Sequence, residues 1–162
     1  MTQPPRPSLG RVAIEENYYK ADQVILEHYQ GFSKEIIQLA SLGIAVLGYL
    51  VKDIATDRSI WPPAGSSSWL LVGAAVAFLV AIACALTHRY CSTHGFGRHV
   101  RAVRALMQKP PDEDRVIEEE SRRKTLYTRS RRLLKGASAA LWSGAFCVAA
   151  WIALALLKSP TP

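Results

Sequence analysis

Three of the four histidines of this 162-residue chain and one of its three cysteines fall within the thirteen residues THRYCSTHGFGRH (87–99). His88, Cys91 and His94 are spaced i, i+3, i+6, which spreads their side chains over about 120° of a helix. Zinc needs three or four ligands that converge on one point. Further ligands would have to come from another histidine or from another chain, so we expect no resident metal and no cofactor.

The same stretch suggests a second chemistry. Arg89 and His94 are separated by four residues, and this spacing resembles the Arg-x4–6-His motif of HEPN ribonucleases. A motif of two residues recurs easily in a basic segment that contains histidines. We favour the simpler interpretation that Arg89, His94 and His99 lie at a membrane interface and meet lipid phosphates. The sequence therefore predicts no catalytic residue, and we expect that the protein is not an enzyme.

Three apolar blocks without a charged residue dominate the rest of the chain: IIQLASLGIAVLGYLV, WLLVGAAVAFLVAIACALT and GASAALWSGAFCVAAWIALALL. A helix needs about 20 apolar residues to cross a hydrocarbon core of about 30 Å. The second and third blocks reach this length, and the first reaches it if residues 32–35 lie at the interface or the bilayer thins locally. The sequence predicts an all-α protein with three transmembrane helices, at about 33–52, 68–88 and 136–157.

Basic residues are distributed unevenly among the segments that join these spans. The segment 88–135 contains 13 lysines and arginines against 6 acidic residues, whereas the segment 52–68 contains two of each. The positive-inside rule then places the N-terminus and the 89–135 arm in the cytoplasm and the C-terminus outside. No signal peptide is recognisable, so we expect a bacterial inner (plasma) membrane protein whose first span is a retained anchor, without a structural disulfide.

The cytoplasmic parts are predicted to be helical extensions of the spans. Residues 1–10 are rich in proline and are expected to form a disordered tail, and residues 11–162 a single membrane domain. Spacings of three and four predict a first helix from about 12 to 52, and we expect the second helix to be interrupted at the GFG sequence of 95–97. The acidic DED sequence should start a third helix that runs to 157. Three i,i+4 pairs should stabilise that helix, namely Glu118–Arg122, Glu119–Arg123 and Glu120–Lys124.

Small residues recur at intervals of four within the predicted spans. In lipid, such residues let helix backbones approach closely. The predicted spans have more of these small-residue faces than one three-helix bundle must bury, which favours a homo-oligomer. The alternative is that alanine is simply common in proteins from high-GC genomes. The positions that we expect to pack are Gly73, Ala77, Ala81, Ala140 and Gly144.

Polar residues of the predicted spans and basic residues of the arm are the remaining candidate sites. The apolar blocks contain no ionisable group, which argues against a pump, but a passive pore needs none. Candidate pore-lining residues are Glu35, Gln38 and Ser41. Arginines suit phosphates, so the arm could bind lipid headgroups or a nucleotide-type signal, whereas no specific nucleic acid is expected. The candidate residues are Arg89, Arg98, Arg101, Arg104, Arg129, Arg131 and Arg132.

A helix leading into a transmembrane hairpin, NYYKADQVILEHYQGFSKEIIQLASLGIAVLGYLV followed by WLLVGAAVAFLVAIACALTHRY, resembles the SLATT membrane effectors of prokaryotic conflict systems. The resemblance covers roughly residues 12–108, and the third span departs from the two-span pattern. It implies an oligomeric pore that a nucleotide signal or a partner activates from the cytoplasm. We therefore expect a protein that alters membrane permeability. The alternative is a non-conducting anchor or scaffold that recruits a soluble protein through helices 12–32 and 114–135.

Overall fold

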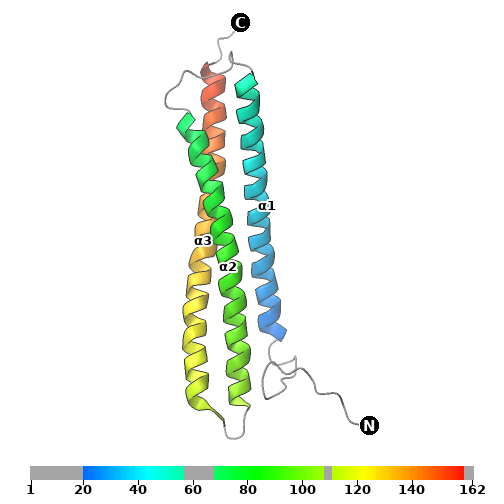
Figure 1. Cartoon of the computed structure of the whole chain (residues 1–162), viewed down its shortest axis with the longest axis vertical. Coiled ribbons are helices and arrows are strands. Elements are labelled where there is room, and N and C mark those ends of the chain that lie inside the picture. Colours follow the sequence, from blue (N-terminus) through cyan, green and yellow to red (C-terminus); the bar gives the residue numbers. More distant parts are fainter. Residues whose placement is uncertain (1–19, 57–67, 108–110, 159–162) are drawn as a thin grey trace, which may run out of the picture. The chain divides into compact units, whose positions relative to one another are not determined.

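The computed structural model describes residues 20–56, 68–107 and 111–158, and these ranges form three long helices (Figure 1). Their bounds are Lys20–Thr56 for α1, Ser68–Leu106 for α2 and Glu113–Lys158 for α3. Each helix is long and apolar enough to cross a membrane. The prediction of an all-α chain with three helices of this kind is therefore confirmed. The predicted tail 1–10 and the first residues of the predicted helix from 12 lie outside the described residues.

The chain divides into two compact units, and each contains a segment of all three helices. The apolar unit comprises residues 31–56, 68–88 and 132–158. The charged unit comprises residues 20–30, 89–107 and 111–131. The boundary separates the apolar blocks from the segments rich in arginine and glutamate, so each unit has its own packing chemistry.

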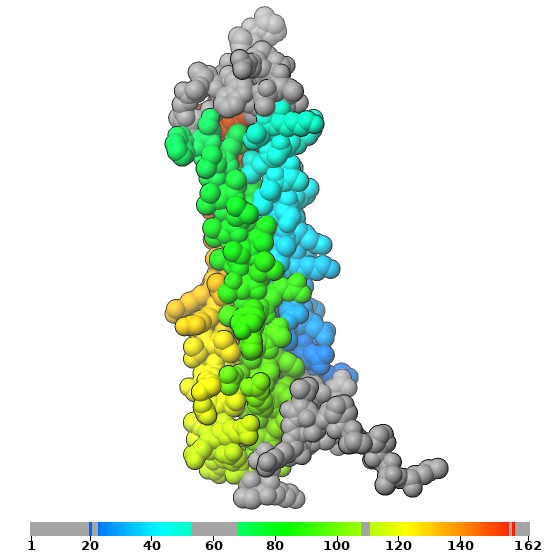
Figure 2. Space-filling model, viewed as in Figure 1, coloured from blue at the N-terminus to red at the C-terminus, as the bar shows by residue number. Residues whose placement is uncertain are grey.

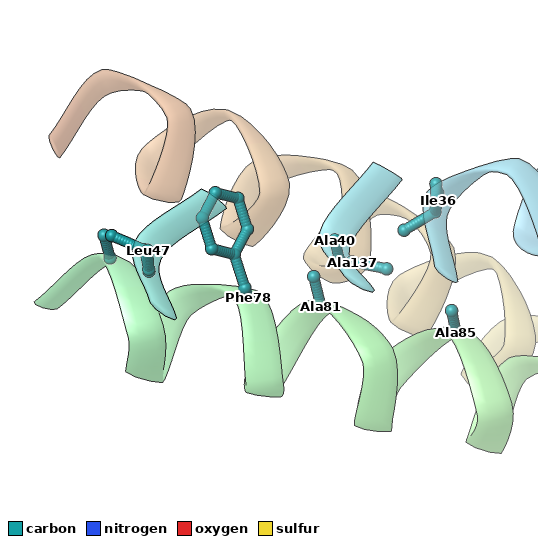
Figure 3. Packing of buried hydrophobic residues seen from close by; sticks show 8 residues of the cluster. Ile36, Ala40, Leu47, Phe78, Ala81, Ala85 and Ala137 are labelled. Carbon is teal, nitrogen blue, oxygen red and sulfur yellow. The ribbon is translucent and has the colours of Figure 1, made fainter. Parts of the chain in front are cut away.

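Small side chains make up most of the core of the apolar unit. Ala40 of α1, Ala81 and Ala85 of α2, and Ala137 of α3 are completely buried, and Ile36 lies in the same cluster (Figure 3). Because the side chain of alanine is only a methyl group, the backbones of neighbouring helices can approach one another closely. The three helices therefore pack closely through alanines, as helices in a lipid environment commonly do.

Phe78 of α2 fills the space between α1 and α3 in this unit. A Cβ placed on Gly43 of α1 would lie 2.6 Å from Cζ of the ring, and one placed on Gly144 of α3 would lie 2.7 Å from Cε1. Carbon atoms in favourable contact lie about 3.5–4.0 Å apart. The two glycines therefore create the space for the ring, which contacts all three helices in one layer.

The predicted interruption of the second helix at residues 95–97 is wrong, because α2 is helical throughout from Ser68 to Leu106. A glycine inside a helix costs about 1 kcal/mol relative to alanine, and two glycines suggested a break. In the charged unit, however, a Cβ on Gly95 would lie 3.5 Å from the ring of Tyr127 on α3. Packing between α2 and α3, which lie side by side here in green and yellow (Figure 2), outweighs the low propensity.

The third helix begins where the sequence predicts it. The Oδ1 atom of Asp112 accepts a hydrogen bond from the backbone N–H of Arg115 at 3.2 Å, which is the geometry of a helix N-cap. The backbone N–H of Val116 donates to the carbonyl of Asp112 at 3.1 Å. The acidic residues Glu113 and Asp114 occupy the first turn, where the helix dipole favours negative charge.

The three predicted ion pairs along α3 have different outcomes. Glu118 and Arg122 pair at 2.6 Å, so this prediction is confirmed. Glu120, which we expected to pair with Lys124, binds Arg123 at 3.1 Å. The Glu118–Arg122 pair lies largely in solvent, where an ion pair contributes at most about 1 kcal/mol, whereas Glu120 and Arg123 are half-buried.

The predicted pair between Glu119 and Arg123 is replaced by contacts between helices. Glu119 is 7% exposed, and its two carboxylate oxygens accept hydrogen bonds from Arg98 of α2 at 3.0 and 3.2 Å. Arg123 donates to Nδ1 of His99 on α2. Burial removes the carboxylate of Glu119 from water, so this charge requires an oppositely charged partner that is buried with it. Arg98 on the facing helix α2 is that partner.

Candidate functional site

The apolar unit exposes much of its apolar surface. In the 18-residue stretch of each helix that best suits a membrane, only 17–22% of the residues are buried inside the single chain. Trp142 and Phe146 of α3 are both 75% exposed, and Tyr49 of α1 is 67% exposed. Soluble monomers rarely expose contiguous apolar patches of this kind. Such a surface is typical of helices that lipid or other helices cover.

A groove with a volume of about 450 Å³ runs between α1 and α3 in the apolar unit. Phe78 contributes from α2, between the two walls. The α1 wall extends from Leu39 to Val46 and the α3 wall from Leu141 to Ile152. At 1.5 Å per residue, the longer wall extends about 16 Å along the helix axis. All the side chains that line the groove are aliphatic or aromatic, so it suits an apolar occupant.

The three candidate pore-lining residues, Glu35, Gln38 and Ser41, are exposed on α1. They lie outside the set of residues that lines the groove. Ser143 of α3 is also exposed, and its hydroxyl donates to the carbonyl of Ala139 at 2.9 Å. One copy therefore does not enclose the candidate polar residues within its own bundle.

The small residues that we expected at helix contacts divide into two groups. Ala81 is fully buried, Gly144 is buried against Phe78, and Ala140 packs against the core. Ala77 is half-buried, whereas Gly73 is exposed, with space for a Cβ 4.0 Å from Sγ of Cys147. The spacing of four within one helix thus identified some of the contacts.

Sequence reasoning missed the central contact, because it paired small residues with small residues. Phe78 and Gly43 were not candidates, although together with Gly144 they form the layer that joins the three helices. Ala40 and Ala74 are also completely buried and were not singled out. The available signal was a single large aromatic residue, Phe78, in the middle of the second apolar block. The two glycines that accommodate its ring lie on other helices, so spacing within one helix could not identify them.

The basic candidates differ in how accessible they are. Arg98 is bound to Glu119, and Arg89 and Arg104 are half-buried. Arg101, Arg129 and Arg131 are exposed in the charged unit, and Arg132 is exposed in the apolar unit. The exposed arginines are therefore better placed than Arg98 to meet an anionic ligand or a lipid headgroup.

The residues of the histidine-rich stretch point in different directions. His88 is buried in the apolar unit, and in the charged unit Cys91 is buried while His94 is exposed, with its ring edge-on to Tyr90 at 4.4 Å. His99 accepts its hydrogen bond from Arg123. Among the described residues, no group of three or more histidine, cysteine, aspartate or glutamate side chains is placed to hold a metal ion. The three cysteines carry free thiols.

Comparisons of the chain with protein-family models, with curated proteins and with solved structures gave no match. The resemblance to SLATT effectors therefore rests on the order of helices and spans in the sequence alone.

Proposed function

We propose that this is an integral membrane protein that assembles into a homo-oligomer and alters membrane permeability. The main support is the exposure of Gln38 and Ser41 on α1, within a stretch that is otherwise apolar. A polar group in hydrocarbon without a partner costs several kcal/mol. An oligomer removes this cost by placing such side chains at contacts between copies or around a water-filled path.

The length of α1 between two lysines fits this proposal. Lys34 and Lys52 are separated by 18 residues, or about 27 Å of helix, close to the hydrocarbon thickness of about 30 Å. With both ammonium groups at the interfaces, Gln38 and Ser41 lie in the inner half of the span and the first helix needs no local thinning of the bilayer.

The charged unit is the proposed sensor. Under the positive-inside rule this unit lies in the cytoplasm with the N-terminus, and the C-terminus lies outside a bacterial inner membrane. Its exposed arginines, Arg101, Arg129 and Arg131, would receive an anionic signal of the nucleotide type or an acidic protein surface. Binding shifts the oligomer towards a conducting state only if the ligand prefers that state.

Reconstitution into liposomes tests the proposal. We expect purified protein to form oligomers and to release a small fluorescent anion or potassium ions, either spontaneously or after nucleotides are added on the side of the charged unit. Gln38→Leu should change the rate of leakage, whereas Ser143→Ala, which removes a polar group from the exposed surface of α3, should not. A chain that is monomeric in detergent and never makes liposomes leaky would refute the proposal.

A specific observation also supports the alternative of an anchor or scaffold. In the charged unit, Ile25 and Tyr29 of α1 are 53% and 52% exposed, and Ile117 of α3 is 68% exposed. Apolar side chains exposed among charged ones favour docking of a soluble protein. This alternative predicts co-purification of one partner in fixed stoichiometry, loss of the partner with Ile25→Glu, and no conductance.

A further inference from the structure

The groove of the apolar unit suits a helix better than a lipid chain. Phe78 lies at the middle of the predicted span 68–88, and Gly43 and Gly144 contact its ring at the same level. The groove extends from Leu39, four residues before Gly43, to Ile152, eight residues after Gly144. With the predicted span 68–88 across a bilayer, as proposed above, the groove crosses the level at which the two leaflets meet. An acyl chain from one leaflet fills part of it, whereas a helix parallel to α1 and α3 fills its whole length.

The surface of α1 in this unit has three distinct faces. One face is buried in the core and includes Ile36, Ala40 and Leu47, and a second face lines the groove through Leu39, Leu42 and Val46. We call the third the small face of α1. It consists of Ser41, Ala45 and Gly48, with Lys34 in line with them at one end, and all four residues are exposed.

The small face has the shape that a groove of large side chains requires. Lys34 and the three small residues are spaced by seven, four and three residues, which places them on one side of the helix. A Cβ added at Gly48 would meet nothing within 4 Å. Short side chains allow the backbone of α1 to approach the bulky residues of a groove on another copy, such as Leu42 and Trp142.

Two charges mark the matching ends of the small face and the groove. Glu35 lies four residues before Leu39 and seven before Leu42, so it continues the line of the groove along α1. Lys34 lies seven residues before Ser41 and continues the small face. Both side chains are exposed, and they are adjacent in sequence. In copies that cross a membrane in the same direction, Lys34 of one copy therefore lies at the depth of Glu35 of the next.

We propose that the small face of α1 in one copy docks into the groove between α1 and α3 of the next copy, with Lys34 paired to Glu35 across the contact. The contact is heterologous, so it forms a ring if the rotation between copies closes. The α1 helices then lie side by side, and the side of α1 between the two faces, which carries Gln38 and Tyr49, faces the ring axis. This inference rests on the proposed function, because it names the surface through which the oligomer assembles.

Substitution of the small face is the first test. Ala45→Leu and Gly48→Leu place a branched side chain where the backbone must enter the groove, and we expect each to convert the oligomer into monomers. Ala83→Leu makes the same change at an exposed position on α2, outside both surfaces, and should leave the subunit number unchanged. The measurement is the mass of the protein in detergent by light scattering, with the detergent mass subtracted. Circular dichroism of each variant shows whether the helices remain intact.

Reversal of the charges is the second test. Lys34→Glu and Glu35→Lys each bring like charges together at every contact, and we expect at least a tenfold loss of assembly affinity. The double variant K34E/E35K restores the pair in reversed order, so it should recover assembly. An equimolar mixture of the two single variants should also recover it, because each supplies the partner that the other lacks.

The outcomes separate this inference from the proposed function. If the oligomer and its leak persist in Ala45→Leu and Lys34→Glu, the docking surface is wrong and the proposed function stands. If the double charge variant is as defective as the single variants, the pairing of Lys34 with Glu35 is wrong. If the protein is monomeric with phospholipid bound in the groove, the groove belongs to lipid and the inference fails.

Discussion

The contact of Phe78 with two glycines makes a sharp prediction about stability. In Gly144→Ala, the new Cβ would lie 2.7 Å from Cε1, 2.9 Å from Cδ1 and 3.1 Å from Cζ of the ring. The ring cannot simply move away towards α1, because a Cβ on Gly43 would already lie within 2.9 Å of three of its atoms. The double substitution of Gly43 and Gly144 would therefore close the space from both sides.

The size of the effect follows from two opposing terms. Replacing a helical glycine with alanine stabilises a helix by about 1 kcal/mol. Forcing a methyl group into a packed core costs about 1–3 kcal/mol. We therefore expect Gly144→Ala to destabilise the protein by up to about 2 kcal/mol. In a Phe78→Ala background the cost of overpacking disappears, so the same substitution should stabilise the protein. The coupling energy between the two positions should accordingly be about 1–3 kcal/mol.

The free energy of unfolding can be measured in mixed detergent micelles, with helix loss followed by circular dichroism. Gly31→Ala is the matched control, because a Cβ at this position meets nothing within 4 Å and only the helix-propensity term remains. It should stabilise the chain equally with and without Phe78. If Gly144→Ala matches Gly31→Ala in both backgrounds, the ring does not occupy the space between the glycines and the reasoning is wrong.

Three further predictions concern the charged unit. Glu119→Gln should lower the free energy of unfolding by about 2 kcal/mol, because it leaves Arg98 without its buried carboxylate. Glu118→Gln, on the exposed pair, should change this free energy by at most about 0.5 kcal/mol, and thermal unfolding of both variants compares the two effects. In the same assay, Gly97→Ala should raise the free energy of unfolding by up to about 1 kcal/mol, because α2 continues through this position and a Cβ there meets nothing within 4 Å. A loss of stability would instead indicate a break in the helix. Asp112→Ala should cost about 1 kcal/mol through the lost N-cap, and Asp112→Asn should restore most of it; equal losses in both would argue against capping.

The fold was largely predictable from local patterns. Long uncharged blocks are unambiguous signals for apolar helices, and the acidic residues that follow a proline pair mark the start of α3 with an accuracy of one residue. The break predicted at 95–97 failed because the conformational cost of glycine is local, whereas the packing that keeps this segment helical includes Tyr127, which lies against Gly95 and is 32 residues away in sequence. Propensity alone contains no information about which residue lies opposite a glycine.

The candidate sites were less predictable, because they depend on which faces of the helices meet. Periodicity identified Ala81 and Gly144 as packing residues but could not identify Gly43 or Phe78, whose contact joins different helices. Similarly, Glu119 has Arg123 four residues away on its own helix, but the carboxylate of Glu119 lies towards α2 and binds Arg98 there. The i,i+4 rule predicts pairs that stay in solvent, and it gives no orientation for a carboxylate that becomes buried.

Phe78 links the stability of one copy to the assembly of several. The same ring packs between Gly43 and Gly144 in the core and contributes to the groove between α1 and α3. A methyl group added at Gly144 can be accommodated only if the ring moves, and the open side of this layer is the groove. A ring displaced into the groove occupies volume that the docked helix of the next copy needs. Substitutions of the two glycines should therefore weaken assembly as well as folding, whereas substitutions on the small face of α1, which lies outside the core, should weaken assembly alone.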